Sequence, residues 1–255
     1  MESEIRNPKS EITDSAFEDL PWLGCDVIVV ETEEWRRDPI GALLRESARL
    51  GAASPRMVVW GQQTHGDGVA VVDETHPLLT ASPSPDRAVG ARLPQTDAII
   101  LLSPGILAAV RTADCVPMIV ADAARRRAAV IHAGWRGTWH QIARKAIRRM
   151  LSLGSRARDL RLWIGPCVRQ ASYEVSADLA RQFAGAFPEA ARAGAVAGRY
   201  LDLAAINRWQ ARAMGVPAEA IADCGVCAFA DRRFPSYRRD GDKAGRILTR
   251  VIIHS

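Results

Sequence analysis

Apolar residues recur along the chain in two spacings that predict different elements. Short runs rich in Val, Ile and Ala, most of them bounded by Gly, Pro or Asp, predict β-strands. These runs occupy residues 56–61, 68–73, 97–102, 106–111, 116–122, 127–132, 160–165 and 247–253. Apolar positions at helical spacing, with capping residues at the ends, predict helices over residues 39–50, 138–153, 176–187 and 202–214. Because adjacent strands are mixed with separate helices, the pattern favours an α+β fold over a regular β-α alternation.

Two segments lack either spacing. Residues 1–22 are acidic and polar and are expected to form a loosely ordered lead-in, so that the folded body starts near Leu23. Residues 75–96 contain Pro77, Pro83, Pro85 and Pro94, which is too much proline for a helix and too long a stretch for an ordinary connection. A surface loop is expected there.

Composition narrows the class of protein. The chain has 255 residues, 48% of them hydrophobic, and 34 Lys and Arg against 29 Asp and Glu. The net charge of +5 suits anionic ligands, but the basic residues stand in short groups between acids and apolar residues, so we expect no nucleic-acid partner. No apolar run approaches the ~18 residues of a membrane span, and no leader pattern is present, so we expect a cytoplasmic protein without a membrane partner.

The histidines and cysteines suggest one site. His65 stands in QQTHGDG and His132 opens HAGWRG after a predicted strand, while Cys115 precedes another strand in TADC. Three loops at strand ends would bring two imidazoles and one thiolate together. Two His and one Cys match the three-ligand pattern of a catalytic zinc, whereas a structural zinc wants four protein ligands. The alternative is a buried Cys with two hydrogen-bonded loop histidines.

A second candidate site lies in HAGWRGT. If a helix starts after Gly137 and is capped by Thr138, its free N–H groups and the bidentate guanidinium of Arg136 suit a phosphate or an oxyanion. The alternative is that Gly134 and Gly137 only form a tight turn. Near the end of the chain, Arg238 and Arg239 precede Asp240 and Gly241 in a basic turn, which is either a solvated hairpin or a further part of an anion site.

The remaining cysteines suggest packing rather than chemistry. Cys224 and Cys227 form a CxxC with no second pair of ligands nearby and no thioredoxin-like strand before it. Cys167 follows a proline at the end of a predicted strand, where a small buried side chain is the ordinary expectation. Thiols are expected in a reducing compartment.

Six segments together resemble the YfiH/FAMIN family, whose members are labelled multicopper polyphenol oxidoreductases or laccase-domain proteins. The segments are QTHGDGV, DAIILLSPGILAAVRTADCVPMIVAD, AAVIHAGWRGT, WIGPCVRQASYEV, YLDLAAINRWQ and SYRRDGDKAGR. The resemblance runs in order from about residue 38 to residue 253. It implies that His65, Cys115 and His132 bind a metal.

The resemblance also implies a fold and an activity. The fold would be a four-layer α/β sandwich with mixed β-sheets, forming a single domain over residues 23–255. The activity would be that of a zinc-dependent purine nucleoside phosphorylase that splits adenosine, inosine and methylthioadenosine with phosphate and also deaminates adenosine. Some bacterial members are instead described as peptidoglycan editing factors.

Two features depart from the family pattern. The amino-terminal strand and the STRxGGxS-like segment of the family are expected to be missing, because LGCDVIVVETEEWRRDP stands in their place, and the Pro-rich stretch is longer than usual. The laccase label also meets a chemical objection. A multicopper cluster needs many histidines arranged largely as HxH pairs, and this chain has five histidines and no HxH. A single copper in a His2Cys site remains an alternative to zinc, since such ligands suit both metals.

These expectations define a mechanism and its rivals. Phosphate held by Arg136, Gly137 and Arg238 or Arg239 would attack the nucleoside, and Asp114 is the expected proton shuttle, with a hydrogen bond to a ligand as its alternative role. One rival is a hydrolase in which Cys115 is a nucleophile activated by His132. Another is a metal-stabilised interaction protein with a fourth protein ligand. A monomer or a small homo-oligomer is expected.

Overall fold

Side chains of the central strands alternate between two buried faces, and this alternation stacks the chain into layers. In β5 (Ala98–Leu101), Ala98 and Ile100 pack toward helices, whereas Ile99 and Leu101 pack toward a second sheet. In β2 (Met57–Gly61), Met57 and Val59 face the space between the sheets, and Val58 faces helices on the outside. The computed structural model that shows this describes residues 14–45, 50, 55–77 and 89–255.

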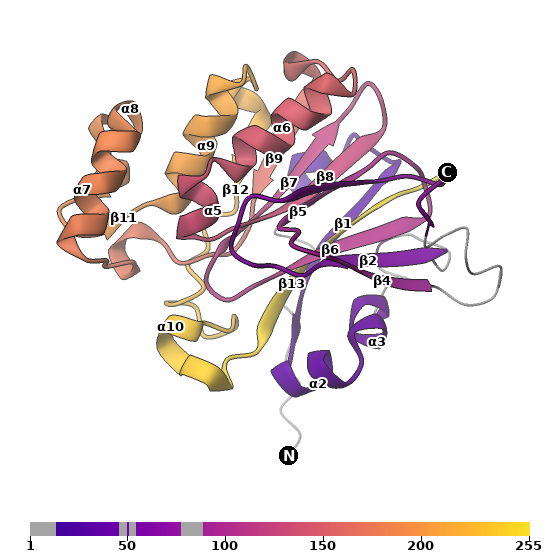
Figure 1. Ribbon diagram of the computed structural model, residues 1–255, viewed down its shortest axis with the longest axis horizontal. Helices are drawn as coiled ribbons and strands as arrows, with labels where there is room; N and C mark the ends of the chain where they lie inside the picture. Colours follow the sequence, from indigo (N-terminus) through magenta and orange to yellow (C-terminus); the bar gives the residue numbers. More distant parts are fainter. Residues whose placement is uncertain (1–13, 46–49, 51–54, 78–88) are drawn as a thin grey trace.

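The two sheets form the middle of the molecule (Figure 1). The first has six strands in the order β12 (Ile221–Asp223), β9 (Leu160–Ile164), β7 (Val116–Asp122), β8 (Arg127–Ala133), β5 and β3 (Val69–Val72). The second has five strands in the order β1 (Leu23–Val30), β13 (Arg246–Ile253), β6 (Ile106–Thr112), β2 and β4 (Val89–Leu93). Both sheets are mixed: β3 runs parallel to β5 and β2 parallel to β6, while β7 is antiparallel to β8 and β1 to β13.

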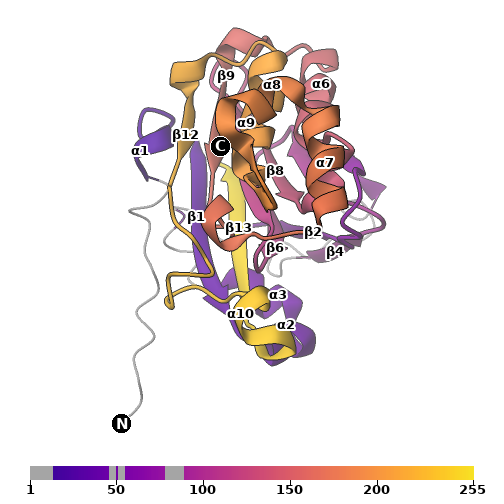
Figure 2. The same ribbon diagram turned by 90° about the vertical axis from the view of Figure 1, so that its left-hand side faces the viewer.

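Helices cover both outer faces, as Figures 1 and 2 show. The six-stranded sheet is covered by α5 (Trp135–Trp139), α6 (Ile142–Ser152), α7 (Ala177–Ala186), α8 (Pro188–Ala190) and α9 (Leu203–Ala213). The five-stranded sheet is covered by α2 (Thr32–Arg37) and α3 (Pro39–Leu44). The remaining elements are the ribbon of β10 (Val196–Ala197) and β11 (Tyr200–Leu201), and the short helices α1 (Asp14–Phe17) and α10 (Tyr237–Asp240). The order helix, sheet, sheet, helix confirms the expected four-layer sandwich with mixed sheets.

Most of the predicted elements are present. All the predicted strands form, and so do two of the helices: α7 has Ser176 as its N-cap, and α9 has Asp202 as its N-cap, with Gly215 in the left-handed region just beyond its end. No helix in the described part of the chain has the length and apolar character that crossing a bilayer requires.

Other predictions were wrong in their boundaries. The helix expected over 138–153 is two helices, because Gln141 has a φ of 60° and separates α5 from α6. Thr138 therefore caps nothing and lies buried inside α5. The helix expected from Pro39 ends at Leu44, where Arg45 turns to an extended conformation; residues 46–49 and 51–54 lie outside the described residues.

The amino-terminal strand is present, contrary to the sequence-based expectation. β1 pairs along its whole length with β13, because VIVV supplies an apolar run for a buried strand and the buried carboxylate of Asp26 pairs with Arg250 of β13. Before it, Phe17 and Leu20 are buried against the core between the sheets. The Pro-rich stretch is also not only loop, since β4 begins at Val89 and pairs with β2; residues 78–88 lie outside the described residues.

Candidate active site and metal centre

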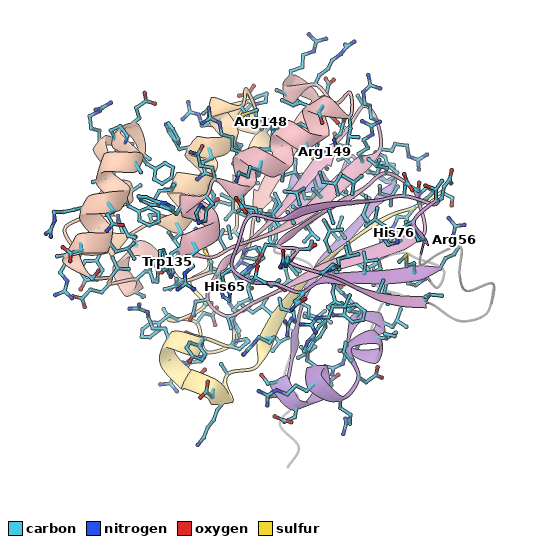
Figure 3. All side chains as sticks on the ribbon, in the orientation of Figure 1. Arg56, His65, His76, Trp135, Arg148 and Arg149 are labelled. Carbon is cyan, nitrogen blue, oxygen red and sulfur yellow. The ribbon has the colours of Figure 1, made fainter. Side chains whose placement is uncertain are left out.

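Three chain segments bring His65, Cys115 and His132 together, as the sequence predicts. His65 lies in the connection from β2 to β3, Cys115 directly precedes β7, and His132 is near the end of β8. Their ligand atoms all lie within 4.8 Å of one another, and the two imidazole rings stand nearly perpendicular, with centroids 4.9 Å apart. Figure 3 shows His65 beside Trp135, whereas His76 lies far away at the opposite end of the strands.

Asp97, directly before β5, supports both histidines of the cluster through hydrogen bonds. Its carboxylate is fully buried and accepts a hydrogen bond of 2.7 Å from Nδ1 of His132. The same carboxylate accepts from the backbone N–H groups of Thr64, His65 and Gly66, at 3.0 to 3.1 Å. With Nδ1 of His132 engaged by Asp97, Nε2 is the nitrogen left for a metal, which is the usual carboxylate–histidine support of a metal site.

The backbone of His65 needs this support. Its φ is 59°, in the left-handed region that a non-glycine residue adopts at a cost of about 1–3 kcal/mol. The buried Asp97 carboxylate offsets that cost by accepting hydrogen bonds on both sides of the residue. His65 is thereby presented to the cluster from an otherwise exposed loop.

Charge in the cluster is shared between Cys115 and His132. Burial opposes ionisation of the Cys115 thiol, but the positive charge of His132 and hydrogen bonds from His132 and His65 outweigh it and lower the pKa of Cys115. Burial likewise opposes protonation of His132, but the Cys115 thiolate and the Asp97 hydrogen bond raise its pKa. The cluster thus favours a thiolate, the form of cysteine that ligates metals and attacks carbon.

The donor set fits a tetrahedral metal ion. Zinc bound by two His nitrogens and one Cys sulfur would need ligand atoms about 3.3–3.6 Å apart, and the candidate ligand atoms here all lie within 4.8 Å of one another. Among the described residues no fourth His, Cys, Asp or Glu joins the group, so an ion held by these three residues would have room for substrate or water as a further ligand. Neither Cys224 nor Cys227 joins a comparable group in the described part of the chain.

The three ligands line a cavity of about 820 Å³ between the ends of the two sheets and α10. The other residues lining it are Gln63, Arg111, Thr112, Ala113, Asp114, Trp135, Arg136, Val168, Tyr173, Leu203, Tyr237, Arg238 and Arg246. One acidic residue, Asp114, and four arginines line the cavity. The cavity is therefore large enough for a nucleoside-sized ligand and has a positive lining.

Asp114 and two of the predicted arginines are in this cavity. Oδ2 of Asp114 accepts a 2.8 Å hydrogen bond from the backbone N–H of Arg238, while Oδ1 is buried with no hydrogen-bond partner among the described residues. The guanidinium of Arg238 lies over the ring of Tyr173, at 5.0 Å, and that of Arg136 over the ring of Trp135, at 4.9 Å. Both cations are thus placed over aromatic rings at the cavity wall.

Gly137 and Arg239 lie apart from the cavity lining. Gly137 lies inside α5, which begins at Trp135, so no helix starts directly after it. A Cβ at Gly137 would come within 2.9 Å of the carbonyl oxygen of Gly66. The guanidinium of Arg239 donates to the carbonyl oxygens of Ala228, Phe229 and Phe234 and to the carboxylate of Asp240. Its donors stabilise the loop before α10, which is a short helix and not a hairpin.

Four residues at the site were missed by sequence reasoning: Asp97, Arg111, Tyr173 and Arg246. Asp97 has one sequence signal, an acid directly before a fully buried strand, which needs a partner if it is itself buried. Arg111 has a similar signal, since it is a cation at the end of an apolar strand. Nothing local in the sequence distinguishes Tyr173 or Arg246.

Cys167 and Cys224 fit packing, as predicted, whereas Cys227 is half-buried, and burial is outweighed by backbone hydrogen bonds and one from Ser172, which lower its pKa. Cys167 is fully buried, and burial raises its pKa. Burial also raises the pKa of Cys224, which packs against the core between the sheets. The Sγ of Cys227 lies 3.7 Å from Oγ of Ser172.

Comparisons with known proteins agree with this fold and show the family to which the chain belongs. Residues 40–254 match the family described as multi-copper polyphenol oxidoreductase laccase. A purine nucleoside phosphorylase of Mycobacterium tuberculosis is 37% identical over 217 residues, covering 84% of this chain and 80% of that protein. An adenosine deaminase from an unknown prokaryotic organism is 33% identical over 199 residues, covering 76% of this chain and 74% of that protein. The crystal structure of a Bacillus licheniformis hypothetical protein, YfiH, superposes with a TM-score of 0.77 at 23% identity, covering 93% of this chain and 94% of the other.

Proposed function

Because this chain belongs to the family described as multi-copper polyphenol oxidoreductase laccase, some of whose relatives are named purine nucleoside phosphorylases, we propose that it is a zinc-dependent purine nucleoside phosphorylase. Adenosine, inosine and methylthioadenosine are the proposed substrates, and deamination of adenosine is a second proposed activity. The observation that carries the proposal is the His65–Cys115–His132 cluster, with one open side toward a cavity of about 820 Å³.

The three ligands would hold the zinc ion through Nε2 of His132, a ring nitrogen of His65 and the thiolate of Cys115. When bound, zinc would supply a Lewis acid beside the substrate, without redox chemistry. Copper in the same three ligands is the alternative, and metal analysis of the purified protein distinguishes the two. The chain's five histidines, with no HxH pair, do not suffice for a multicopper cluster.

In phosphorolysis, an oxygen of phosphate forms a bond to C1′ of the ribose as the bond from C1′ to the purine nitrogen breaks. The bond electrons leave with the base, which takes up a proton, and ribose 1-phosphate remains. Asp114 is the proposed carrier of that proton, because its Oδ1 faces no competing partner among the described residues. Arg136 and Arg238 are the proposed contacts to the substrate, since both guanidinium groups line the cavity.

Deamination would use the same site with water in place of phosphate. Water adds to C6 of adenosine, ammonia leaves, and inosine is the product. The carboxylate of Asp114 would accept the proton of the attacking water and return it to the leaving amino group.

A second candidate function is a metal-free cysteine hydrolase acting on a peptidoglycan precursor or another amide. The observation that favours it is the charge pair of Cys115 and His132, in which the thiolate is preferred. Metal analysis separates the candidates: an active preparation free of zinc and copper supports the hydrolase and excludes the metal-dependent enzyme. We also propose a reducing compartment such as the cytoplasm, since Cys115, Cys167, Cys224 and Cys227 are free thiols.

The decisive experiment is incubation of the purified protein with adenosine, in phosphate and in phosphate-free buffer. Adenine formed only with phosphate supports phosphorolysis, and inosine formed in both buffers supports deamination. His65→Ala and Cys115→Ala should abolish both products while circular dichroism remains unchanged. If a zinc-loaded preparation forms neither adenine nor inosine, the proposed activities are excluded.

A further inference from the structure

Arg111 and Arg246 form one wall of the cavity, apart from the arginines that the sequence analysis selected. Arg111 is near the end of β6 and Arg246 begins β13, and these strands pair so that Arg111 lies opposite Leu248 and Thr112 opposite Ile247. The two guanidinium-bearing residues therefore lie on adjacent strands at the same sheet end. Arg111 is four residues before Cys115, so this wall adjoins the metal cluster.

Neither cation has a carboxylate within ion-pair distance in the described part of the chain, although the charge of Asp242 acts on Arg246. Arg111 and Arg246 form no ion pair there, whereas Arg169, for example, pairs with Asp223. Nε of Arg111 is buried without a hydrogen-bond partner, and its guanidinium lies 4.7 Å from the ring centroid of Trp35. A buried donor without a partner is destabilising, more so on a charged group, unless a ligand satisfies it.

The backbone around Arg111 is fixed. The side chain of Gln63 donates to the carbonyl oxygen of Arg111 at 2.7 Å and accepts from its backbone N–H at 2.9 Å. Nη1 of Arg246 donates to the carbonyl oxygens of Ala244 and Gly245, which orients that side chain as well. Both cations are held before any ligand arrives.

Electrostatics favour an anion between them. Burial, together with the charges of Arg246 and Arg92, lowers the pKa of Arg111 to about 10, so the group stays charged at neutral pH but in a repulsive environment. A doubly charged anion would relieve this repulsion. Guanidinium groups bind phosphate oxygens in pairs of parallel hydrogen bonds, with a geometry that carboxamides and ammonium groups do not match.

We propose that Arg111 and Arg246 bind the phosphate that attacks the nucleoside. This inference rests on the proposed phosphorylase function and assigns its second substrate to a specific wall of the cavity. Arg136 and Arg238, which lie over Trp135 and Tyr173, then remain for the nucleoside.

The test compares Arg111→Gln and Arg246→Gln with the wild-type protein in phosphorolysis, with phosphate and nucleoside varied separately. The KM for phosphate should rise about ten- to a hundredfold in each variant, the range expected for a lost charged hydrogen-bond pair. The KM for the nucleoside should change far less. Arg92→Gln is the matched control, because it removes an exposed charge near Arg111 that does not line the cavity, and it should behave as the wild type.

Calorimetric titration with inorganic phosphate makes the result independent of turnover. If the wild type binds phosphate and both variants do not, the phosphate site is supported even when the wild type shows no phosphorolysis. In that case only the proposed phosphorylase function is rejected. An unchanged phosphate KM in both variants, with phosphorolysis intact, overturns the inference and leaves the function standing. A wild-type protein that binds no phosphate overturns the inference. If Arg111→Gln does not fold, as judged by thermal melting, Arg111→Lys and Arg246→Gln decide the matter.

Discussion

At the scale of single residues, Asp97 positions more of the site than any ligand does. One buried carboxylate orients the His132 ring and holds the left-handed backbone at His65, so two of the three ligands depend on it. Its partners are 31 to 35 residues away in sequence, which is why no local pattern indicates its role.

Asp97→Asn should therefore weaken metal binding without removing a ligand. An amide has one acceptor oxygen in place of two, and its NH₂ would face backbone N–H groups or His132. Zinc affinity should fall about 10- to 100-fold, the usual cost of losing the carboxylate behind a His ligand. Titration with zinc against a competing chelator measures it.

Asp122→Asn provides the matched control for this prediction. Asp122 is equally buried, but its carboxylate accepts from the backbone N–H groups of Ala124 and Arg125, away from the site. Its zinc affinity should equal that of the wild type. Equal losses in both variants would mean that a general loss of stability, and not the support of His132, explains the effect.

Gly134→Ala tests how tightly the cluster is packed. A Cβ at this position would lie 3.0 Å from Sγ of Cys115 and 3.1 Å from Cδ2 of His65, so both ligands would have to move. We expect lower zinc affinity and lower activity, although the φ of −75° at Gly134 tolerates alanine. Gly185→Ala is the control, since a Cβ there meets nothing within 4 Å. Normal zinc binding by Gly134→Ala would contradict the close packing.

The three candidate ligands could be predicted from sequence because they stand at strand ends in motifs that resemble those of the YfiH/FAMIN family, whereas their spacing alone left the alternative of a buried Cys and two hydrogen-bonded histidines open. The cavity arginines could not be ranked in the same way. Arg239 stands in the same motif as Arg238, yet its guanidinium donates hydrogen bonds to loop carbonyl oxygens. Arg111 has no sequence feature that distinguishes it from other residues at strand ends. Which guanidinium lacks a partner depends on residues distant in sequence, so only the folded chain shows it.

At the scale of elements, strands were more predictable than helix boundaries. Each of the eight predicted strands carries its own apolar run, whereas the break between α5 and α6 depends on tertiary contacts. Thr138 is held there by Asn207 and Gln210 of α9, which donate to its hydroxyl and carbonyl oxygens at 2.8 Å. These hydrogen bonds engage Thr138, the predicted N-cap, inside α5, the helix that carries Trp135 and Arg136.

Asp223, at the end of β12, makes stability depend on pH. Burial alone would raise its pKa, but hydrogen bonds from Arg169 and Gly225 and the charges of Arg169 and Arg208 outweigh burial and lower it. A carboxyl with a lower pKa in the folded than in the unfolded state stabilises the fold above its ordinary pKa of about 3.9, and that stabilisation is lost as the pH falls through the folded value.

Asp223→Asn should therefore destabilise the protein at pH 6 by about 1–3 kcal/mol, the usual range for hydrogen bonds to charged groups. The difference from the wild type should shrink as the pH falls below about 4. Denaturant unfolding at several pH values measures it. Asp178→Asn, which removes an exposed ion pair, should change stability by about 1 kcal/mol or less at any pH. A difference that is independent of pH would contradict the role given to the ionised carboxylate.

At the scale of the whole molecule, the site joins the two sheets. Cys115 and His132 come from the six-stranded sheet, and His65 from the connection that leaves the five-stranded sheet at β2 and enters the other at β3. The fold class was predictable because the strands alternate or are apolar throughout, which requires layers on both sides. The pairing of β1 with β13, about 220 residues apart in the chain, has no local signature.

A metal that bridges these segments should stabilise the native state. An ion that binds only the folded chain adds about 2.7 kcal/mol at a free concentration 100 times its Kd. For a protein of this size, each kcal/mol of added stability raises the Tm by roughly 2–4 °C, so the bound ion should raise the Tm by about 5–11 °C. Thermal melting with added zinc and after chelation measures the shift, which should vanish in Cys115→Ala. A shift of the same size in that variant would mean that the stabilising ion binds elsewhere and that the cluster of two imidazoles and one thiolate is not the metal-binding site.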